Sequence, residues 1–157
     1  MSIHLSISDD LPTSGEPDLA NSAILERAAS ETLRYAGASD QVELTIAIQG
    51  DEALAGLNQQ YLGIDAPTDV LSFSANEIDP DSGARYLGDV LISFPRAQAQ
   101  AAAGGHATLD ELQLLIVHGV LHLLGYDHAE PPEKEAMWAA QAEILGRLGC
   151  QVTAPPT

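Results

Sequence analysis

The strongest constraint on the fold is an apolar segment at residues 114–124 that is interrupted by two histidines. His118 and His122 are four residues apart, and on an α-helix this spacing places both imidazoles on one face, one turn apart. Their neighbours are leucine, isoleucine and valine, and an unpartnered polar ring is costly to bury in such surroundings. A metal ion removes that cost, because it takes the neutral imidazole as a ligand. The segment therefore predicts a buried helix that carries two metal ligands.

A third ligand is predicted at His128, because Gly125 lies between it and the helix. Glycine readily adopts the left-handed conformation that ends a helix, so the chain can turn back towards the same ion. Three nitrogen ligands suit zinc and leave a fourth position for water, which is typical of catalytic sites. The pKa of a bound water would fall towards neutrality. The alternative interpretation is that the three histidines fall together by chance.

The spacing of the three histidines and of the glycine before the last of them matches the zincin-type signature H-E-x-x-H-x-x-G-x-x-H, except at one position. The residue after the first histidine is Gly119, where metalloproteases have the glutamate that acts as general base. The pattern therefore predicts a metal hydrolase whose substrate is not a peptide.

Length and charge limit the class of protein. A chain of 157 residues suits one domain, which we expect to span residues 1–149, with a disordered tail at 150–157. Six Lys and Arg residues against 23 Asp and Glu residues give a formal net charge of −17. Taken alone, this charge argues against a nucleic-acid partner, although a small basic patch remains compatible with the sequence.

Three further observations predict a cytoplasmic protein without a membrane partner. The sequence has no apolar run long enough to span a membrane. The first residues, Met1-Ser2-Ile3-His4, lack the features of a signal peptide. The single cysteine, Cys150, rules out an internal disulfide and fits a reducing compartment.

The periodicity of apolar residues predicts an α+β fold. Alternation predicts strands at residues 3–7, 42–49, 70–74 and 87–93, and helical spacing predicts helices at about 18–36, 51–63, 95–103, 108–124 and 133–148. Polar, glycine- and proline-rich loops are expected at 9–17 and 75–86. We expect one domain with a small four-stranded mixed sheet and about five helices, the zincin-like metal helix being buried among the others. The helix between the second and third strands predicts at least one parallel pair.

Two helix caps and a fourth histidine complete the local predictions. Asp51 is expected to cap the second helix, and Thr108 with Glu111 forms a capping-box pattern at the start of the metal helix. His106 precedes that helix and is expected to lie on the surface, because the metal already has three ligands.

The segment from His118 to His128 resembles the signature of the YbeY family of metal-dependent endoribonucleases. Other stretches agree in order, namely Asn58-Gln-Gln-Tyr61, Pro67-Thr68-Asp69-Val70-Leu71-Ser72-Phe73, Leu87-Gly88-Asp89-Val90 and Met137-Trp138. The resemblance spans residues 3–149 and implies a zinc-dependent endoribonuclease specific for single-stranded RNA. It implies a role in maturation of 16S ribosomal RNA and in ribosome quality control, with ribosomal RNA and the small ribosomal subunit as cytoplasmic partners and no DNA partner. One zinc ion per chain would be held by the three histidines.

Two positions depart from the family pattern. Leu62 stands where the family commonly has an arginine, which is thought to engage RNA phosphate or support cleavage. Ser74 stands where the family usually has proline. Arg85 and Arg96, which flank the fourth strand, are candidates to replace the missing arginine.

The remaining site candidates are assigned by position. Asp127, beside the third ligand, is predicted to orient a histidine or to accept a proton, with a plain loop carboxylate as the alternative. Thr68, Asp69, Asp89 and Arg85 are candidates for the surroundings of the metal or for a substrate loop. For Asp69, a turn residue that caps its own backbone is the favoured alternative.

Two other functions remain open at the level of the sequence. One is a ribosome-associated zinc-binding assembly factor with weak or no nuclease activity, and the other is a zinc hydrolase of a different substrate. Nickel, cobalt or copper can also occupy three imidazoles in vitro. The attacking group in RNA cleavage is either a metal-activated water or the 2′-hydroxyl of the RNA.

Overall fold

The computed structural model describes residues 1–8, 22–63, 68–127 and 129–150, with the side chain of Leu62 excepted. These residues form four strands and five helices in a single small domain, so the predicted α+β fold is confirmed. In chain order they are β1 (Ser2–Ile7), α1 (Ser22–Tyr35), β2 (Val42–Gln49), α2 (Asp51–Leu62), β3 (Val70–Ile78), β4 (Arg85–Ser93), α3 (Phe94–Gly104), α4 (Thr108–Leu123) and α5 (Pro131–Leu148). The predicted loop at 9–17 lies outside the described residues, and so does the predicted tail at 150–157 except for Cys150, which is buried.

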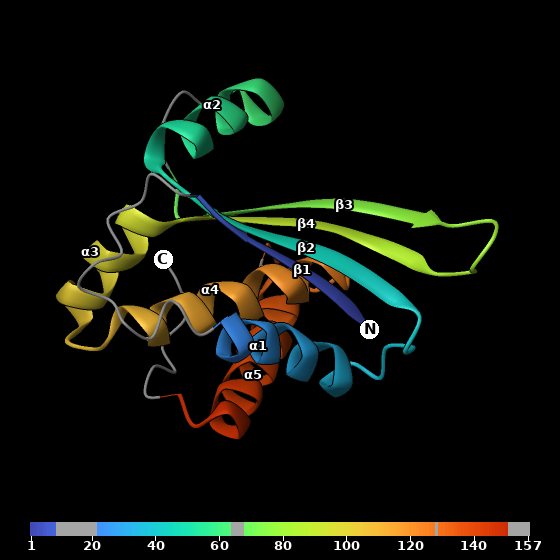
Figure 1. Cartoon of the computed structure of the whole chain (residues 1–157). Coiled ribbons are helices and arrows are strands. Elements are labelled where there is room, and N and C mark those ends of the chain that lie inside the picture. The colour runs from blue at the N-terminus through green and yellow to red at the C-terminus, as the bar shows by residue number, and fades with distance from the viewer. Residues whose placement is uncertain (9–21, 64–67, 128, 151–157) are drawn as a thin grey trace.

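The sheet is mixed, with the strand order β1-β2-β4-β3 (Figure 1). β1 pairs with β2 and β2 pairs with β4 in parallel, whereas β3 pairs with β4 in antiparallel orientation. The predicted parallel pairing is therefore present. The helix that follows β2 leads to the edge strand β3, however, and β4 takes the place beside β2.

Most of the helical layer lies on one face of the sheet, and α4 is its centre. Figure 1 shows α1, α3, α4 and α5 on that face, while α2 lies on the opposite face at one end. The inward residues of β2 are fully or almost fully buried, and α4 contacts α1, α3, α5, β3 and β4. Because neighbouring elements surround α4 on several sides, the helix is buried almost all round, and most of its buried residues are apolar. The predicted burial of the metal helix is confirmed.

The hairpin of β3 and β4 is longer than the sequence predicts. The expected strand at 70–74 continues to residue 78, and the expected loop at 75–86 shrinks to residues 79–84. Pairing resumes beyond an irregularity between Ser74 and Glu77, where Asn76 has a φ of 52°. The outer half of β3 is exposed and polar, so backbone pairing rather than burial maintains it. Alternation of apolar residues reports burial, which is why it missed this extension.

Both side-chain caps predicted from the sequence are wrong. Asp51 is the first residue of α2, whose N-cap is Gly50 without a side-chain hydrogen bond. The carboxylate of Asp51 instead accepts a hydrogen bond from Ser93 Oγ at 2.5 Å. Thr108 is likewise the first residue of α4 and not its N-cap.

His106 is mostly buried, in contrast to the predicted surface histidine. Its Nε2 atom lies 2.7 Å from Oε1 of Glu111, and the two side chains are 16% and 5% exposed. Glu111 thus pairs with a histidine and not with the backbone at the helix start. The contact joins the loop before α4 to the first turns of the helix. Within the described residues, no helix is long and apolar enough to cross a membrane.

Candidate active site

The two histidines of α4 lie close together on one face of the helix, as the sequence predicts. Their Nε2 atoms are 3.2 Å apart, and the rings meet at 78° with centroids 4.7 Å apart. His118 is only 5% exposed, and His122 is half-buried. Two imidazole nitrogens bound to one tetrahedral metal ion, each at about 2.0–2.1 Å, would lie about 3.3 Å apart. The observed separation therefore fits a shared metal ion.

The last helix, α5, fixes the orientation of the first ring. Gln141 is 1% exposed, and its Oε1 atom lies 3.1 Å from Nδ1 of His118. Because an amide oxygen only accepts hydrogen bonds, this contact favours the tautomer of His118 that has its proton on Nδ1 and its lone pair on Nε2. The ring of Trp138, also on α5, lies 5.9 Å from that of His118 between centroids. A hydrogen bond of this kind, on the nitrogen that faces away from the metal, is typical of metal-binding histidines.

The chain turns directly after α4. The helix ends two residues before Gly125, which has a φ of 101° and so provides the predicted left-handed turn. His128 lies outside the described residues. In the part of the chain that the structure describes, no group of three His, Cys, Asp or Glu side chains is placed to hold a metal ion. The described site contains two of the three predicted ligands, and the third stays a prediction.

Gly119 allows α4 to approach the sheet closely. A Cβ atom at this position would lie 2.5 Å from Cγ1 of Val90 and 3.3 Å from Oγ of Ser72. The hydroxyl of Ser72 donates a hydrogen bond to the carbonyl oxygen of Gly119 at 3.1 Å. Any side chain here would require α4 or the strands beneath it to shift. The glycine that replaces the zincin glutamate thus has a packing role.

Asp127 is exposed and lies on the turn that follows the metal helix. Together with Gly125 and Tyr126 of that turn, and Glu133 and Ala136 of α5, it lines a cavity of about 250 Å³. Asp127 is therefore exposed to solvent, and in the sequence it directly precedes His128. Its role as a proton acceptor remains a prediction.

Asp69 connects three elements at one end of the sheet. Its Oδ1 accepts a hydrogen bond from the N–H of Val70 at 2.8 Å, and its Oδ2 accepts one from Nε2 of Gln100 at 3.3 Å. Its carbonyl oxygen accepts a hydrogen bond from the N–H of Ser93 at 2.9 Å. Thr68, directly before it, is half-buried. These contacts fit a turn residue that caps its own backbone.

Asp89 lies on the sheet face opposite α4. Val90 packs against Gly119 of α4, and successive residues of a strand point to opposite faces. The hydroxyl of Tyr86 donates a hydrogen bond to Oδ1 of Asp89 and lies 2.6 Å from Oγ1 of Thr45. Burial raises the pKa of Tyr86, and the hydrogen bond to Asp89 raises it further. The structure thus joins Asp89 to a polar network on the outer face rather than to the histidines.

The two arginines that flank β4 have different partners. Arg85 at its start is exposed and donates to Oδ1 of Asn76, from Nε at 3.1 Å and from Nη2 at 2.5 Å. Arg96, beyond its end, places Nε 3.5 Å from the carboxylate of Asp51. Leu62, which stands where the family commonly has an arginine, is the last residue of α2.

Two residues near the histidines, Gln141 and Ser72, are not among the site residues that the sequence predicts. Gln141 belongs to the buried stripe of α5, with Met137, Ala140, Ile144 and Leu145. A single polar residue within an otherwise apolar stripe is the signal that points to Gln141. Ser72 offers no such signal, because its partner is a backbone carbonyl.

Comparison with known proteins identifies the family. The sequence model described as Endoribonuclease YbeY matches residues 14–149. The endoribonuclease YbeY of Roseiflexus castenholzii is 48% identical over 136 residues, which cover 83% of this chain and 86% of that protein. The endoribonuclease YbeY of Geobacillus kaustophilus is 40% identical over 156 residues, which cover 95% of this chain and 98% of that protein.

A solved structure is similar in fold. The solution structure of TM1509 from Thermotoga maritima matches with a TM-score of 0.55 and 23% identity, and the match covers 96% of this chain and 94% of that one. This likeness supports the arrangement of strands and helices. Because the family's sequence model spans most of the chain and both relatives are at least 40% identical, the chain belongs to the endoribonuclease YbeY family.

Proposed function

We propose that this protein is a metal-dependent endoribonuclease that cleaves single-stranded ribosomal RNA during maturation of the small ribosomal subunit in the cytoplasm. The observation that carries the proposal is the pair of Nε2 atoms of His118 and His122, 3.2 Å apart, with Gln141 on the far nitrogen of His118. Membership of the endoribonuclease YbeY family supports RNA as the substrate. We assign the activity to residues 1–149 as one domain.

Zinc is the metal that we propose, with one ion per chain held by His118, His122 and His128. Its tetrahedral geometry with imidazole ligands agrees with the separation of the first two nitrogens. When bound, it would act as a Lewis acid on the scissile phosphate and lower the pKa of a bound water.

The other residues of the site have separate roles in the proposed reaction. Gln141 keeps the proton on Nδ1 of His118, so that Nε2 is free to bind metal. The apolar residues around α4 exclude water from the inner side of the site. Asp127, exposed on the following turn, is our candidate for the group that takes a proton from the attacking oxygen. That oxygen belongs either to water or to the 2′-hydroxyl of the RNA, and the ends of the products distinguish the two routes.

The packing of Gly119 argues against a peptide hydrolase. The glutamate that serves as base in zincin-type proteases would occupy this position, and even a Cβ atom here would lie 2.5 Å from Val90. A site of this shape needs a substrate that brings its own nucleophile or uses a base elsewhere. RNA, with its 2′-hydroxyl, meets that requirement.

The proposal is tested by incubating purified, metal-quantified protein with a single-stranded ribosomal RNA fragment. Wild-type protein is expected to cleave the RNA, whereas His122→Ala and chelator-treated protein are expected not to. The matched control is His4→Ala, because His4 lies on β1 with its side chain 59% exposed. Absence of cleavage by metal-loaded wild-type protein would contradict the proposal and favour a ribosome-associated assembly factor. The net charge of −17 and Leu62 are the features of this chain that fit that second function.

A further inference from the structure

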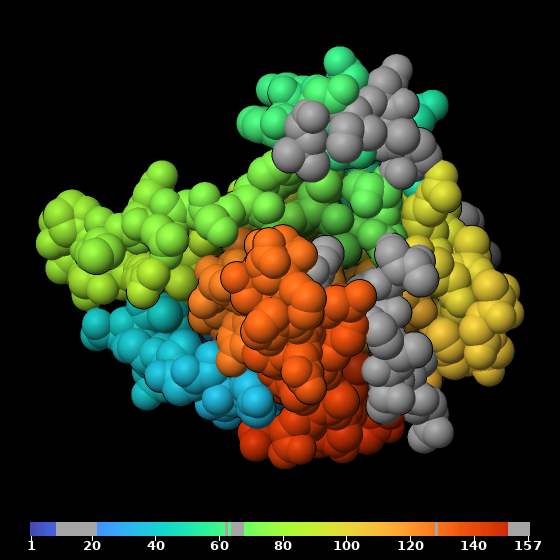
Figure 2. Space-filling view, turned by 180° about the vertical axis from the view of Figure 1, so that it is seen from behind, coloured from blue at the N-terminus to red at the C-terminus, as the bar shows by residue number. Residues whose placement is uncertain are grey.

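A second cavity lies under the β3–β4 hairpin, on the same side of the sheet as α4. It has a volume of about 410 Å³, within the range of about 300–1,000 Å³ that is typical of small-molecule sites. Its wall includes Val42 of β2, Ile78 of β3, Arg85 and Leu87 of β4, and Leu124 and Tyr126 of the turn after α4. Figure 2 shows that the hairpin projects beyond the helical layer, with residues of α1 beneath it. The cavity is therefore a hollow between the hairpin and the helices.

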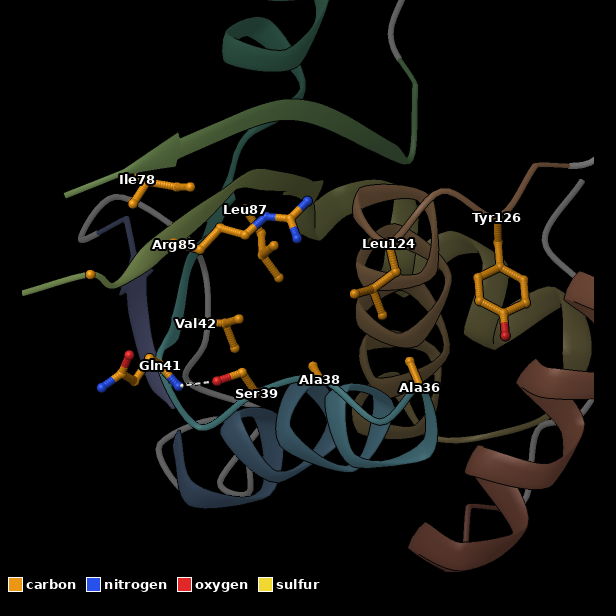
Figure 3. Close-up of a pocket in the computed structure, with 11 residues that line it drawn as sticks. Ala36, Ala38, Ser39, Gln41, Val42, Ile78, Arg85, Leu87, Leu124 and Tyr126 are labelled. Carbon is orange, nitrogen blue, oxygen red and sulfur yellow. Dashed lines mark hydrogen bonds between the residues drawn. The ribbon is translucent and has the colours of Figure 1, made fainter. Parts of the chain in front are cut away.

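Arg85 is the cation of this cavity, and its orientation is fixed. Its Nε and Nη2 atoms both donate to Oδ1 of Asn76, which leaves its other N–H groups available. Asn76 occupies the irregular position of β3 with a φ of 52°, a left-handed conformation that asparagine adopts more readily than most other residues. Such irregularities often serve to re-aim a side chain next to a site. Figure 3 shows Arg85 reaching from β4 towards the end of α4, above Val42.

The charge of Arg85 is not neutralised by a carboxylate. Arg34, Arg96 and Arg147 each form an ion pair with an acidic side chain. Among the described residues, no carboxylate lies within ion-pair distance of Arg85, and its partner Asn76 is neutral. In a chain with a net charge of −17, an oriented arginine without an acidic partner at the rim of a cavity favours an anionic ligand.

The walls of the cavity favour a ligand with a flat apolar part. Val42 and Leu87 are buried, and Leu124 and the ring of Tyr126 form the opposite side (Figure 3). Leu124 and Tyr126 follow His122 by two and four residues, so the cavity shares the turn that leaves the metal helix. The same two residues line the smaller cavity beside Asp127. The turn thus separates two adjacent hollows, one of which contains the candidate proton acceptor.

We propose that this cavity binds one nucleotide of the single-stranded RNA, with the base between Leu87, Leu124 and Tyr126 and the phosphate on Arg85. The inference rests on the proposed function, because it places a second nucleotide of the same substrate beside the metal site. Unstacked bases of single-stranded RNA lie readily against aromatic and apolar side chains, and arginine binds phosphate through paired N–H groups.

The test measures binding of a fluorescent single-stranded oligoribonucleotide to His122→Ala protein, in which the RNA is not consumed. Arg85→Gln in this background is expected to raise the Kd roughly tenfold, as for loss of a hydrogen-bonded charge. It should also lower the slope of log K against log salt by about 0.7, the value for one phosphate contact on a single strand. Ala36→Trp, which fills the cavity from the exposed turn directly after α1, should raise the Kd without changing the slope. Arg34→Gln is the control, because it removes the same charge from an arginine that is paired with Glu31.

The outcomes separate this inference from the proposed function. If wild-type protein cleaves RNA while Arg85→Gln and Ala36→Trp bind it as tightly as the Arg34→Gln control, the nucleotide site is overturned and the nuclease stands. If wild-type protein binds RNA through Arg85 without cleaving it, the nucleotide site stands and the nuclease is overturned. If the protein does not bind the RNA at all, both are overturned.

Discussion

Two histidines near the two ends of α4 have polar partners of different charge. Before the helix, Nε2 of His106 lies 2.7 Å from the carboxylate of Glu111. In its last turns, Nδ1 of His118 lies 3.1 Å from the amide oxygen of Gln141. Both rings are largely enclosed by protein. Glu111 therefore offers a carboxyl group, whereas Gln141 offers an amide oxygen.

The difference shows how the same residue type serves two purposes in one helix. A carboxylate can pair with an imidazolium ring, in which both nitrogens are donors and no lone pair is left for a metal. An amide oxygen accepts the one proton of a neutral ring and leaves the other nitrogen open. We infer that His106 ties the preceding loop to α4, and that His118 is oriented to bind metal.

Replacing one histidine near each end of α4 should give the largest difference in metal content and cleavage rate. His122→Ala is expected to lower the cleavage rate by about 1,000-fold or more, because an open metal site needs its protein ligands. His106→Ala should keep the metal content of wild-type protein. Metal analysis of both purified variants, together with a cleavage assay, checks this. Loss of metal from His106→Ala would contradict the division of roles between the two ends.

The partner of His118 should matter for metal affinity. Gln141→Leu removes the acceptor for the Nδ1 proton at similar side-chain size, and is expected to weaken metal binding by about 10- to 100-fold. Gln141→Glu keeps an acceptor and should bind metal more tightly than the leucine variant. Competition with a chromophoric chelator measures both affinities. Equal affinities in the two variants would mean that Gln141 only fills space.

At the other end of α4, the expected effect is on stability rather than on metal. Glu111→Leu leaves the buried ring of His106 without this partner, and is expected to lower the free energy of unfolding by about 1–3 kcal/mol. Denaturant unfolding measures the loss, and metal affinity should remain that of wild-type protein. A drop in metal affinity as large as that of Gln141→Leu would show that the two ends are coupled.

Two glycines should give the smallest effects. At Gly119 an alanine Cβ would lie 2.5 Å from Val90 in the sheet, and the cost of overpacking is offset in part by the better helix propensity of alanine. We expect Gly119→Ala to lose about 1 kcal/mol of stability. At Gly56, inside α2, no atom lies within 4 Å of the position that a Cβ would take. Thermal unfolding should therefore show no loss for Gly56→Ala, and a loss as large as that of Gly119→Ala would contradict the close helix–sheet packing at Gly119.

The sequence predicts the histidine pair well because its geometry is local. Four residues on a helix place His118 and His122 together whatever surrounds the helix. Gln141 is 23 residues from His118, so its contact depends on how α4 and α5 pack. The pairing of His106 with Glu111 was missed for a different reason. The pattern Thr-x-x-Glu fits a capping box, but the helix begins at Thr108 itself and Glu111 faces the preceding loop.

The hairpin of β3 and β4 shows where hydrophobic patterns stop being informative. The predicted strand ended at Ser74, since the following residues are polar and exposed. Backbone hydrogen bonds extend the pairing to Ile78 and Arg85, and they do not depend on side-chain polarity. The cavity beneath this hairpin, with Arg85 on its rim, was therefore beyond prediction from the sequence.

The strand order has a consequence for the order of events in folding. β1 reaches β2 only after the chain has passed through α1, and β2 reaches β4 only after α2 and β3. Loops of that length close slowly, whereas β3 and β4 are joined by residues 79–84 alone and can pair within microseconds. We therefore expect Asn76 and Arg85 to meet early in folding, because both lie in this hairpin, and His118 to meet Gln141 only when α5 docks. We therefore expect Arg85 to take its place near the beginning of folding, and the ring of His118 to be oriented near its end.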